Sequence, residues 1–419
     1  MGKEAGAWER RTTELNASVL SVCDTGTLLE SDDVSEWTDV VAVGLYQLEQ
    51  KPAAAAAEVG CDQGGSQVRT GGIQLFRFAR GSDGGDGGDR DAKSLSPCLR
   101  DGVIDTGSGV FELKWFQQLG HGAHTLALAK AGGEVSIHRI GLPDTRDGAG
   151  ESRRVEAGEN KELSSQSLTE GREGVFCLCV DVEDRGPGSQ SERGRGVAAS
   201  TSDGFLHLLR CREAELSLVS QWRAHDLEPW SVSLDKSAPH LLYSGADDSL
   251  LLGWDLRAPT DRASLEVPAS PPEGDWEPSR VFLNRRAHEA GVCCVRTHAS
   301  RPEHLVSGSY DERVRVWDKR NLGRPLVVHE VEAGGGVWRL EWCAWDPAMA
   351  VAACMYGGCK ALGLRLDAGA VDVVAQYKGH GSIAYGADFL PPLAEVGASD
   401  GVDVVSCSFY DNQVHGWTF

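Results

Sequence analysis

Short apolar runs recur along the chain, each bounded by glycine, serine or charged residues. The clearest are VFELKW (110–115), VFCLCV (175–180), PWSVSL (229–234), VCCVRT (292–297), VWRLEW (337–342) and AYGADF (384–389). Short runs that alternate or are rich in β-branched and aromatic residues are typical of β-strands. Their recurrence predicts an all-β protein built from similar units.

One unit is visible in three clear copies. In each copy a turn aspartate lies six residues before a tryptophan, and a histidine follows a small residue further upstream. The three sets are His225, Asp248 and Trp254; His288, Asp311 and Trp317; and His380, Asp411 and Trp417. We expect each set, with a strand serine, to form a buried hydrogen-bond network that tolerates no missing partner. The pattern indicates WD repeats, and therefore a β-propeller.

Degenerate copies fill the rest of the chain and bring the number of units to seven, although eight blades are also sterically reasonable. The predicted fold is an all-β, seven-bladed WD-repeat β-propeller with disordered or loop insertions, spanning 1–419 as one domain. The predicted blades are 14–80, 103–140, 174–222, 223–257, 286–330, 334–378 and 379–419. Segments rich in glycine, proline, serine and charge predict flexible insertions at about 81–101, 141–172, 183–196 and 258–280.

Composition narrows the classes of partner. The formal net charge is -21, which argues against nucleic acid or an anionic membrane, because both reward clustered lysine and arginine. The 12 cysteines form no CxxC pair and no metal-ligand cluster, as expected for reduced thiols of a cytoplasmic protein. No apolar run approaches membrane-spanning length. We therefore expect a cytoplasmic monomer with no metal and no cofactor.

Alignment of the copies on the turn aspartate shows an unusual position. The residue just before the aspartate is tyrosine in four copies and aspartate in another: Tyr46, Asp247, Tyr310, Tyr356 and Tyr410. This position should lie near the central opening, on the face where the histidine-bearing loops emerge. A turn beside solvent has little packing reason to select tyrosine repeatedly. Aromatic faces attract quaternary ammonium groups, so the position predicts a mouth that binds a cation.

The innermost strands add two further sets. One is aromatic and includes Phe111, Phe176, Trp230, Trp338 and Tyr385; the other is polar and includes Glu112, Lys114, Arg296, Arg339, Glu341 and Asp388. The aromatic set is explained either by packing between blades or by ligand binding. The polar set is explained either by ion pairs across blades or by catalysis. The chain has no G-x-S-x-G elbow, phosphate-binding loop or HExxH motif.

Several stretches go beyond a generic WD repeat. They are QWRAHDLEPW (221–230), YSGADDSLLLGWDLR (243–257), HEAGVCCV (288–295), SGSYDERVRVWDKRNLGRPL (307–326), GGGVWRLEW (334–342), AACMYGG (352–358) and YGADF (385–389). In this order and spacing the chain resembles the diphthine methylesterase family of WD-repeat proteins in diphthamide biosynthesis. The resemblance is strongest from about residue 221 to the C-terminus.

The resemblance implies a carboxylic ester hydrolase. Its substrate would be methylated diphthine on elongation factor 2, which carries a trimethylammonium group next to a methyl ester. The substrate-binding set would be Tyr46, Asp247, Tyr310, Trp338, Tyr356, Tyr385, Tyr410 and Trp230. The resemblance assigns no catalytic residues. From the residue types alone, we expect Arg339 to stabilise the oxyanion and Asp388 or Glu112 to act as base, with His288 as an alternative to its structural role.

Two other functions stay open at this point. A non-enzymatic adaptor would hold a modified or basic peptide on the same face of the propeller. A reader of methylated lysine would also use an aromatic mouth.

Overall fold

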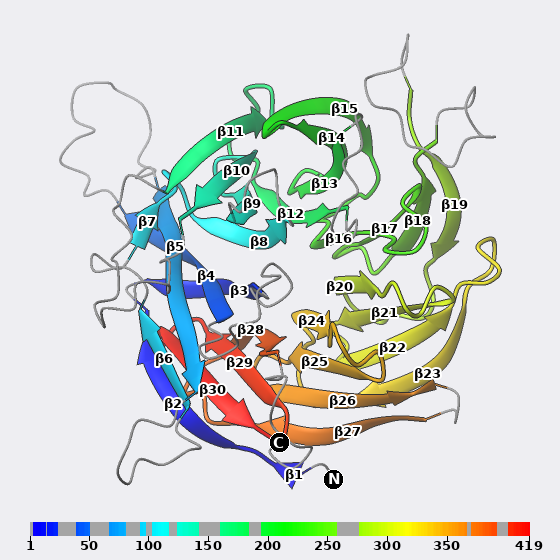
Figure 1. Cartoon of the computed structure of the whole chain (residues 1–419). Coiled ribbons are helices and arrows are strands. Elements are labelled where there is room, and N and C mark those ends of the chain that lie inside the picture. The colour runs from blue at the N-terminus through cyan, green and yellow to red at the C-terminus, as the bar shows by residue number, and fades with distance from the viewer. Residues whose placement is uncertain are drawn as a thin grey trace, which may run out of the picture.

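Seven sheets surround a central axis in the computed structural model, as the blades of a propeller (Figure 1). The structure describes residues 3–13, 15–23, 39–50, 67–80, 93–97, 103–116, 124–141, 160–183, 194–257, 276–366, 370–391 and 401–419. The predicted all-β, seven-bladed fold is confirmed.

The first four blades follow one another along the chain, with the first strand of each innermost (Figure 1). Blade one contains β3 (Asn16–Cys23), β4 (Asp39–Gln50), β5 (Gln67–Arg80) and β6 (Lys93–Pro97), and β7 (Val103–Asp105) also pairs with β5. Blade two contains β8 (Val110–Phe116), β9 (His124–Lys130), β10 (Glu134–Ile140) and β11 (Lys161–Ser167). Blade three contains β12 (Cys177–Val182), β13 (Arg195–Thr201), β14 (Phe205–Arg212) and β15 (Glu215–Arg223). Blade four contains β16 (Ser231–Leu234), β17 (Leu241–Gly245), β18 (Leu251–Asp255) and β19 (Ser279–Asn284).

The last three blades close the ring. Blade five contains β20 (Val292–Thr297), β21 (His304–Ser309), β22 (Arg313–Asp318) and β23 (Leu326–Glu332). Blade six contains β24 (Arg339–Trp342), β25 (Met349–Ala353), β26 (Cys359–Arg365) and β27 (Ala370–Tyr377). Blade seven contains β28 (Ala384–Phe389), β29 (Asp403–Ser408) and β30 (Gln413–Thr418).

The outermost strand of blade seven comes from the start of the described chain. Strand β2 (Gly6–Thr12) pairs antiparallel with β30, and β1 (Lys3–Glu4) pairs parallel with β27 of blade six. The predicted limits of blades one and seven missed this closure, because 6–12 carries no repeat signal and only its distant partner makes it a strand. The two ends of the described chain are thereby joined in one sheet.

Apolar side chains of the blades gather in seven clusters, one between each pair of neighbouring blades. The cluster between blades five and six, for example, joins Val306 and Val316 to Leu340 and Leu362. Each blade therefore buries both of its faces, which explains why an inner strand such as VCCVRT is buried at every position instead of at alternate ones. The nine cysteines whose side chains the structure describes are all buried.

Two predicted insertions contain ordered strands. Strand β6 lies within 81–101 and β11 lies within 141–172, so the prediction is wrong for these residues. Both are the outermost strands of their blades, and most side chains of β11 are exposed or half-buried, so a polar sequence suffices there. Strands β13 and β19 likewise begin inside the predicted 183–196 and 258–280. The segments 81–92, 142–159, 184–193 and 258–275 lie outside the described residues.

The predicted WD network is complete in blade four; blades five and seven keep the contacts among histidine, serine and tryptophan but lack the predicted contact between histidine and turn aspartate. In blade four, Nε2 of His225 lies 2.8 Å from Ser244 Oγ and Nδ1 lies 3.0 Å from Asp248, while the Trp254 indole donates to the same Ser244 Oγ at 3.0 Å. Blade seven repeats the serine contacts with His380, Ser406 and Trp417. A single hydroxyl thus joins the entry loop to the third strand of the blade.

Blade five shows the same arrangement with one change. The His288 ring lies 2.9 Å from Ser307 Oγ, which also accepts the Trp317 indole N–H at 2.8 Å. The turn carboxylate of Asp311 pairs with Arg315 at 2.8 Å and accepts the backbone N–H of Glu289. Burial lowers the pKa of His288 to about 3, so the ring is neutral at physiological pH.

The serine at the centre of this network gives a test of the fold. Ser307→Ala removes two buried hydrogen bonds and leaves the His288 and Trp317 nitrogens without a partner. We expect the free energy of unfolding to fall by about 2–4 kcal/mol, because each buried unsatisfied group costs roughly 1–3 kcal/mol. Urea denaturation followed by tryptophan fluorescence measures the change. The control Ser300→Ala, at an exposed turn, should stay close to wild type, and equal stability of both variants would contradict the network.

No helix in the described ranges is long and apolar enough to cross a membrane.

Candidate functional site

A ring of aromatic side chains lines one end of the propeller axis. Consecutive rings lie with their centroids 4.9–6.1 Å apart, in the order Phe176, Phe111, Tyr46, Phe409, Tyr385, Trp338 and Trp230. We call these seven residues the aromatic collar. They come from six blades, and Tyr310 of the remaining blade contacts Trp338 edge-on at 6.0 Å. Aromatic pairs at such distances attract one another, so these contacts stabilise the arrangement of the collar.

Backbone irregularities aim two of these rings at the axis. The pairing register of β8 with β9 shifts between Val110 and Glu112, which leaves Phe111 as the extra residue of a β-bulge. Tyr385 is the extra residue of a corresponding bulge in β28. Bulges of this kind redirect a side chain and are common beside active sites. The strand pattern alone gives no sign of them.

Tyr46 reaches the collar by a different route from the one predicted. It does not lie in a tight turn, because β4 continues to Gln50 and pairs with β5 along its whole length. Its ring instead packs beside Gly109, where a Cβ atom would meet Tyr46 Cδ2 at 2.4 Å. The residue still lies in the mouth, although the predicted turn position is wrong for blade one.

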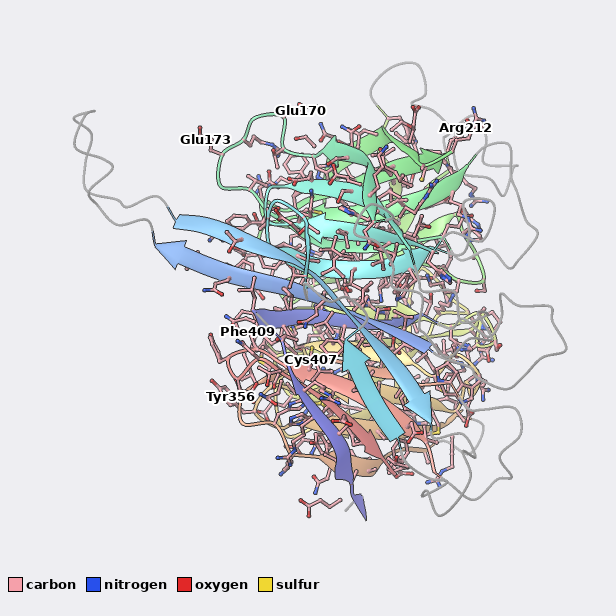
Figure 2. The ribbon with its side chains drawn as sticks, turned by 60° about the vertical axis from the view of Figure 1, so that its left-hand side comes forward. Glu170, Glu173, Arg212, Tyr356, Cys407 and Phe409 are labelled. Atoms are coloured by element: carbon pink, nitrogen blue, oxygen red, sulfur yellow. The ribbon has the colours of Figure 1, made fainter. Side chains whose placement is uncertain are left out.

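The remaining tyrosines of the predicted set differ in exposure. Tyr310 is 44% exposed, Tyr410 is 69% exposed and packs edge-on against Phe409, and Tyr356 is 87% exposed. Figure 2 shows Tyr356 and Phe409 on the same side of the molecule. Tyr356 therefore stands at the outer rim, without a ring contact among the described residues.

Asp247 adds an acidic group to the mouth. It is partly buried, and burial raises the pKa of its carboxyl group, as do Glu228 and Asp248 nearby, whereas the neighbouring Trp230 indole lowers it. Burial, with Cys293 and Asp247 as neighbours, also raises the pKa of Tyr310 to about 12. Asp247 is therefore a neighbour of both Trp230 and Tyr310.

Below the collar, ion pairs cross the axis of the propeller. Lys114 Nζ of blade two lies 2.6 Å from Glu341 Oε1 of blade six, and Arg296 Nη2 of blade five lies 3.0 Å from the same oxygen. Burial opposes ionisation of Glu341, but Arg296 and Lys114 outweigh it and lower its pKa to about 2. Ion pairing across blades is thus the role of these polar residues.

Arg339 and Glu112 form the upper part of this charged layer. The Arg339 guanidinium lies 5.3 Å from the Trp338 ring centroid, and its Nη2 donates to the carbonyl oxygen of Phe111 at 3.0 Å. Its Nε lies 3.4 Å from Glu112 Oε2, which is longer than a hydrogen bond. Both side chains are buried. Of the four predicted catalytic residues, these two lie nearest to the collar by contact.

The other two predicted catalytic residues are engaged elsewhere. His288 belongs to the blade-five network described above. Asp388 accepts backbone N–H groups of Val22 and Phe389 at 2.9 and 2.8 Å. Its carboxyl group lies lower in the axis than Arg339, since it follows the collar residue Tyr385 by three positions.

Comparison with known proteins identifies the chain. The family model described as "WD domain, G-beta repeat" matches residues 276–318. The human protein named "Diphthine methyltransferase" is 29% identical over 377 residues, covering 87% of this chain and 73% of its own length. The mouse protein of that name is 31% identical over 387 residues, covering 88% of this chain and 69% of its own length. The chain belongs to the diphthine methyltransferase family.

Membership extends over nearly the whole propeller. The fission yeast "Diphthine methyltransferase" is 24% identical, and the match covers 94% of this chain and 98% of that protein. The resemblance to this family is therefore confirmed. The relatives are named methyltransferase, in place of the name methylesterase used above. A chain in the "Crystal Structure of Mitotic Checkpoint Complex" is similar in fold, with a TM-score of 0.57 at 14% identity over 99% of this chain.

Two residues of the mouth, Phe409 and Arg69, were not predicted from the sequence. Phe409 directly precedes the aligned tyrosine position, so an alignment one residue wider finds it. Arg69 lies on β5 and places its guanidinium carbon 4.1 Å from the Phe176 ring centroid, with Nε donating to Tyr46 Oη at 3.1 Å. Nothing in the repeat marks it, because blade one has no clear copy of the pattern. The described residues contain no cluster of three or more His, Cys, Asp or Glu suited to a metal ion.

The carboxyl group of Asp388 gives a pH-dependent test. Burial, and then Glu341, raise its pKa to about 7, against about 3.9 in an unfolded chain. Between these values the folded state holds a proton that the unfolded state has released, so stability is lost as pH rises towards 7. We expect Asp388→Asn to reduce the fall in unfolding free energy between about pH 5 and pH 8.

Chemical denaturation at the two pH values measures this difference. Asp318 is the matched control, because its hydrogen bonds with Arg320 lower its pKa to about 2, below the window. Asp318→Asn should keep the wild-type pH dependence. An Asp388→Asn variant with the same pH dependence as wild type would show that Asp388 is already ionised at pH 5.

Proposed function

We propose that the chain hydrolyses the methyl ester of methylated diphthine on elongation factor 2. Family membership supports the substrate, since the relatives are named for diphthine. The aromatic collar is the observation that carries the proposal, because this substrate has a trimethylammonium group beside the ester. In the reaction the ester is cleaved by water, giving methanol and the free carboxyl group of diphthine.

The collar suits the cationic part of the substrate. Quaternary ammonium groups bind over aromatic faces, with each contact worth about 0.5–2 kcal/mol depending on desolvation. Trp338, Trp230 and Tyr385 present adjacent rings with centroids 5.1 Å apart. Asp247 supplies negative charge beside Trp230. Tyr46, Tyr310 and Tyr410 would complete the enclosure, with Tyr356 contacting the protein substrate at the rim.

The layer below suits ester cleavage. A carboxyl group with a pKa near 7 is well matched to a general base at neutral pH, and Asp388 meets this condition. Because Asp388 lies below the collar, it would act on the attacking water through a further water molecule. Arg339 would provide positive charge under the reacting carbon, and Glu112 beside it is the alternative base. Such preorganised charge is usually the largest contribution to stabilising an oxyanion.

The partner is proposed to be elongation factor 2 itself. A protein substrate would approach the mouth from the face on which Tyr356 and Tyr410 are exposed. We propose that the protein acts there as a monomer in the cytoplasm, with no nucleic acid or membrane taking part.

One experiment separates hydrolysis from the alternatives. Purified protein is mixed with elongation factor 2 bearing methylated diphthine, in oxygen-labelled water, and the modified peptide is followed by mass spectrometry. Hydrolysis removes one methylene's mass in ordinary water and incorporates one labelled oxygen in labelled water. Binding without any mass change would instead indicate an adaptor. Absence of both binding and conversion would contradict the proposal and favour a reader of methylated lysine.

Tyr46 of the collar and Tyr310 beside it should affect substrate binding. Tyr46→Ala combined with Tyr310→Ala removes two aromatic faces worth about 0.5–1 kcal/mol each at a partly exposed site. The apparent KM should therefore rise roughly tenfold. Steady-state kinetics on modified elongation factor 2 measures it. Trp345→Ala, which removes an exposed aromatic ring outside the collar, is the control and should leave KM unchanged. Unchanged kcat and KM in the double variant would exclude the collar from binding.

A further inference from the structure

The mouth already contains a cation of the protein's own. The guanidinium of Arg69 stacks over Phe176, with 4.1 Å from its carbon to the ring centroid, and its Nε is bound to Tyr46 Oη. Arg69 is only partly buried. Among the described residues it has no carboxylate partner. An arginine held on an aromatic face keeps its remaining N–H donors for an acceptor from outside.

A long hairpin brings Arg69 to this place. Strands β4 and β5 continue for four residue pairs beyond Tyr46 and Gly71, as far as Gln50 and Gln67. Figure 2 shows this hairpin extending past the body of the propeller on the side where Phe409 is labelled. Arg69 lies in the extension, and its carbonyl oxygen accepts the backbone N–H of Gly109 at 3.2 Å. The extension is thus tied at its base to the strand that carries Phe111.

Arg69 divides the collar into two chemically different parts. On one part, formed by Phe176, Phe111 and Tyr46, the guanidinium already uses an aromatic face. On the other part, formed by Trp230, Trp338 and Tyr385, Asp247 lies near Trp230. The only arginine or lysine that the described residues place over one of these rings is Arg339, at 5.3 Å from the Trp338 centroid, and Glu112 offsets its charge at 3.4 Å. A free cation is repelled by the first part and attracted by the second.

We infer that Arg69 binds the carboxyl oxygen of the substrate while the Trp230 part of the collar binds its quaternary ammonium group. The inference rests on the proposed function and adds a residue to it. The ester and the trimethylammonium share one carbon in this substrate, so a ligand that places its cation near Asp247 can turn its carboxyl group towards Arg69. The site therefore selects betaines and betaine esters over simple quaternary cations.

The same contact would assist hydrolysis. The oxygen of water forms a bond to the carbonyl carbon, and negative charge moves onto the carbonyl oxygen. The bond from that carbon to the methoxy oxygen then breaks, and methanol leaves with a proton. The carbonyl oxygen becomes part of the product carboxylate. An N–H bond from a guanidinium strengthens as this charge develops, which is the property required of an oxyanion donor.

Two small ligands test the inference without the protein substrate. Tetramethylammonium carries only the cation, and glycine betaine carries a carboxylate beside it. Binding is followed by titration calorimetry, with the fluorescence of the collar tryptophans as a second signal. In Arg69→Gln the dissociation constant for glycine betaine should rise about tenfold, since hydrogen bonds to charged groups contribute about 1.5–3 kcal/mol. Affinity for tetramethylammonium should stay the same or increase, because a repelling charge is gone.

Opposite responses to the two ligands distinguish contact from a structural role. Arg69→Lys keeps the charge but not the planar donor pair. Its dissociation constant for glycine betaine should lie between those of wild type and Arg69→Gln. Arg320→Gln, at an exposed arginine paired with Asp318, is the control and should change neither affinity. Equal weakening of both ligands, no change in either, or absence of betaine binding in wild type would each overturn the inference.

The esterase assay separates this inference from the proposed function. Ligand selectivity that depends on Arg69, without ester cleavage on elongation factor 2, would support the betaine site and contradict the enzyme. Ester cleavage with unchanged kcat and unchanged betaine affinity in Arg69→Gln would support the enzyme and contradict the role of Arg69.

Discussion

Burial of apolar side chains between neighbouring blades is the interaction on which the rest of this structure depends. No single hydrophobic core exists in the described propeller; seven clusters, each shared by two blades, take its place. A blade without both neighbours would expose an apolar face, so the arrangement is stable only as a complete ring. The axis is then left to polar side chains, and the ion pairs of Lys114, Arg296 and Glu341 occupy it. The mouth above them is free to carry residues chosen for binding.

The regular part of the fold was readable from the sequence because its hydrogen-bond partners need fixed residue types at fixed spacing. His225, Ser244 and Trp254 form one network; the copy with His288 keeps its spacing, and the copy with His380 keeps the six-residue distance from the turn aspartate to the tryptophan. Strands at the outside of blades were harder to find. Strand β11, with the sequence KELSSQS, has one face in solvent and no repeat signature, so its polar residues resembled an insertion. Its strand conformation depends on β10 beside it.

Only part of the mouth could be predicted from the sequence, because only some of its residues occupy positions that repeat. Tyr310 and Trp338 could be predicted because they occupy repeated positions in clear copies. The bulge that turns Phe111 inward depends on pairing with β9, and the position of Arg69 depends on a hairpin that departs from the repeat. Departures from a repeat carry function but, by their nature, cannot be aligned to it. A structure is needed to bring them together.

The pairing of β2 with β30 has a consequence for synthesis of the protein. Gly6 and Thr418 are opposite one another in the closing sheet, so nearly the whole chain lies between the two partners. During translation β2 is synthesised long before β30 and has no antiparallel partner until β30 has emerged. Contacts so distant in sequence form slowly, and unpaired strand edges favour aggregation. The ring therefore cannot close before β30 is available, and β2 presents an unpaired edge until then.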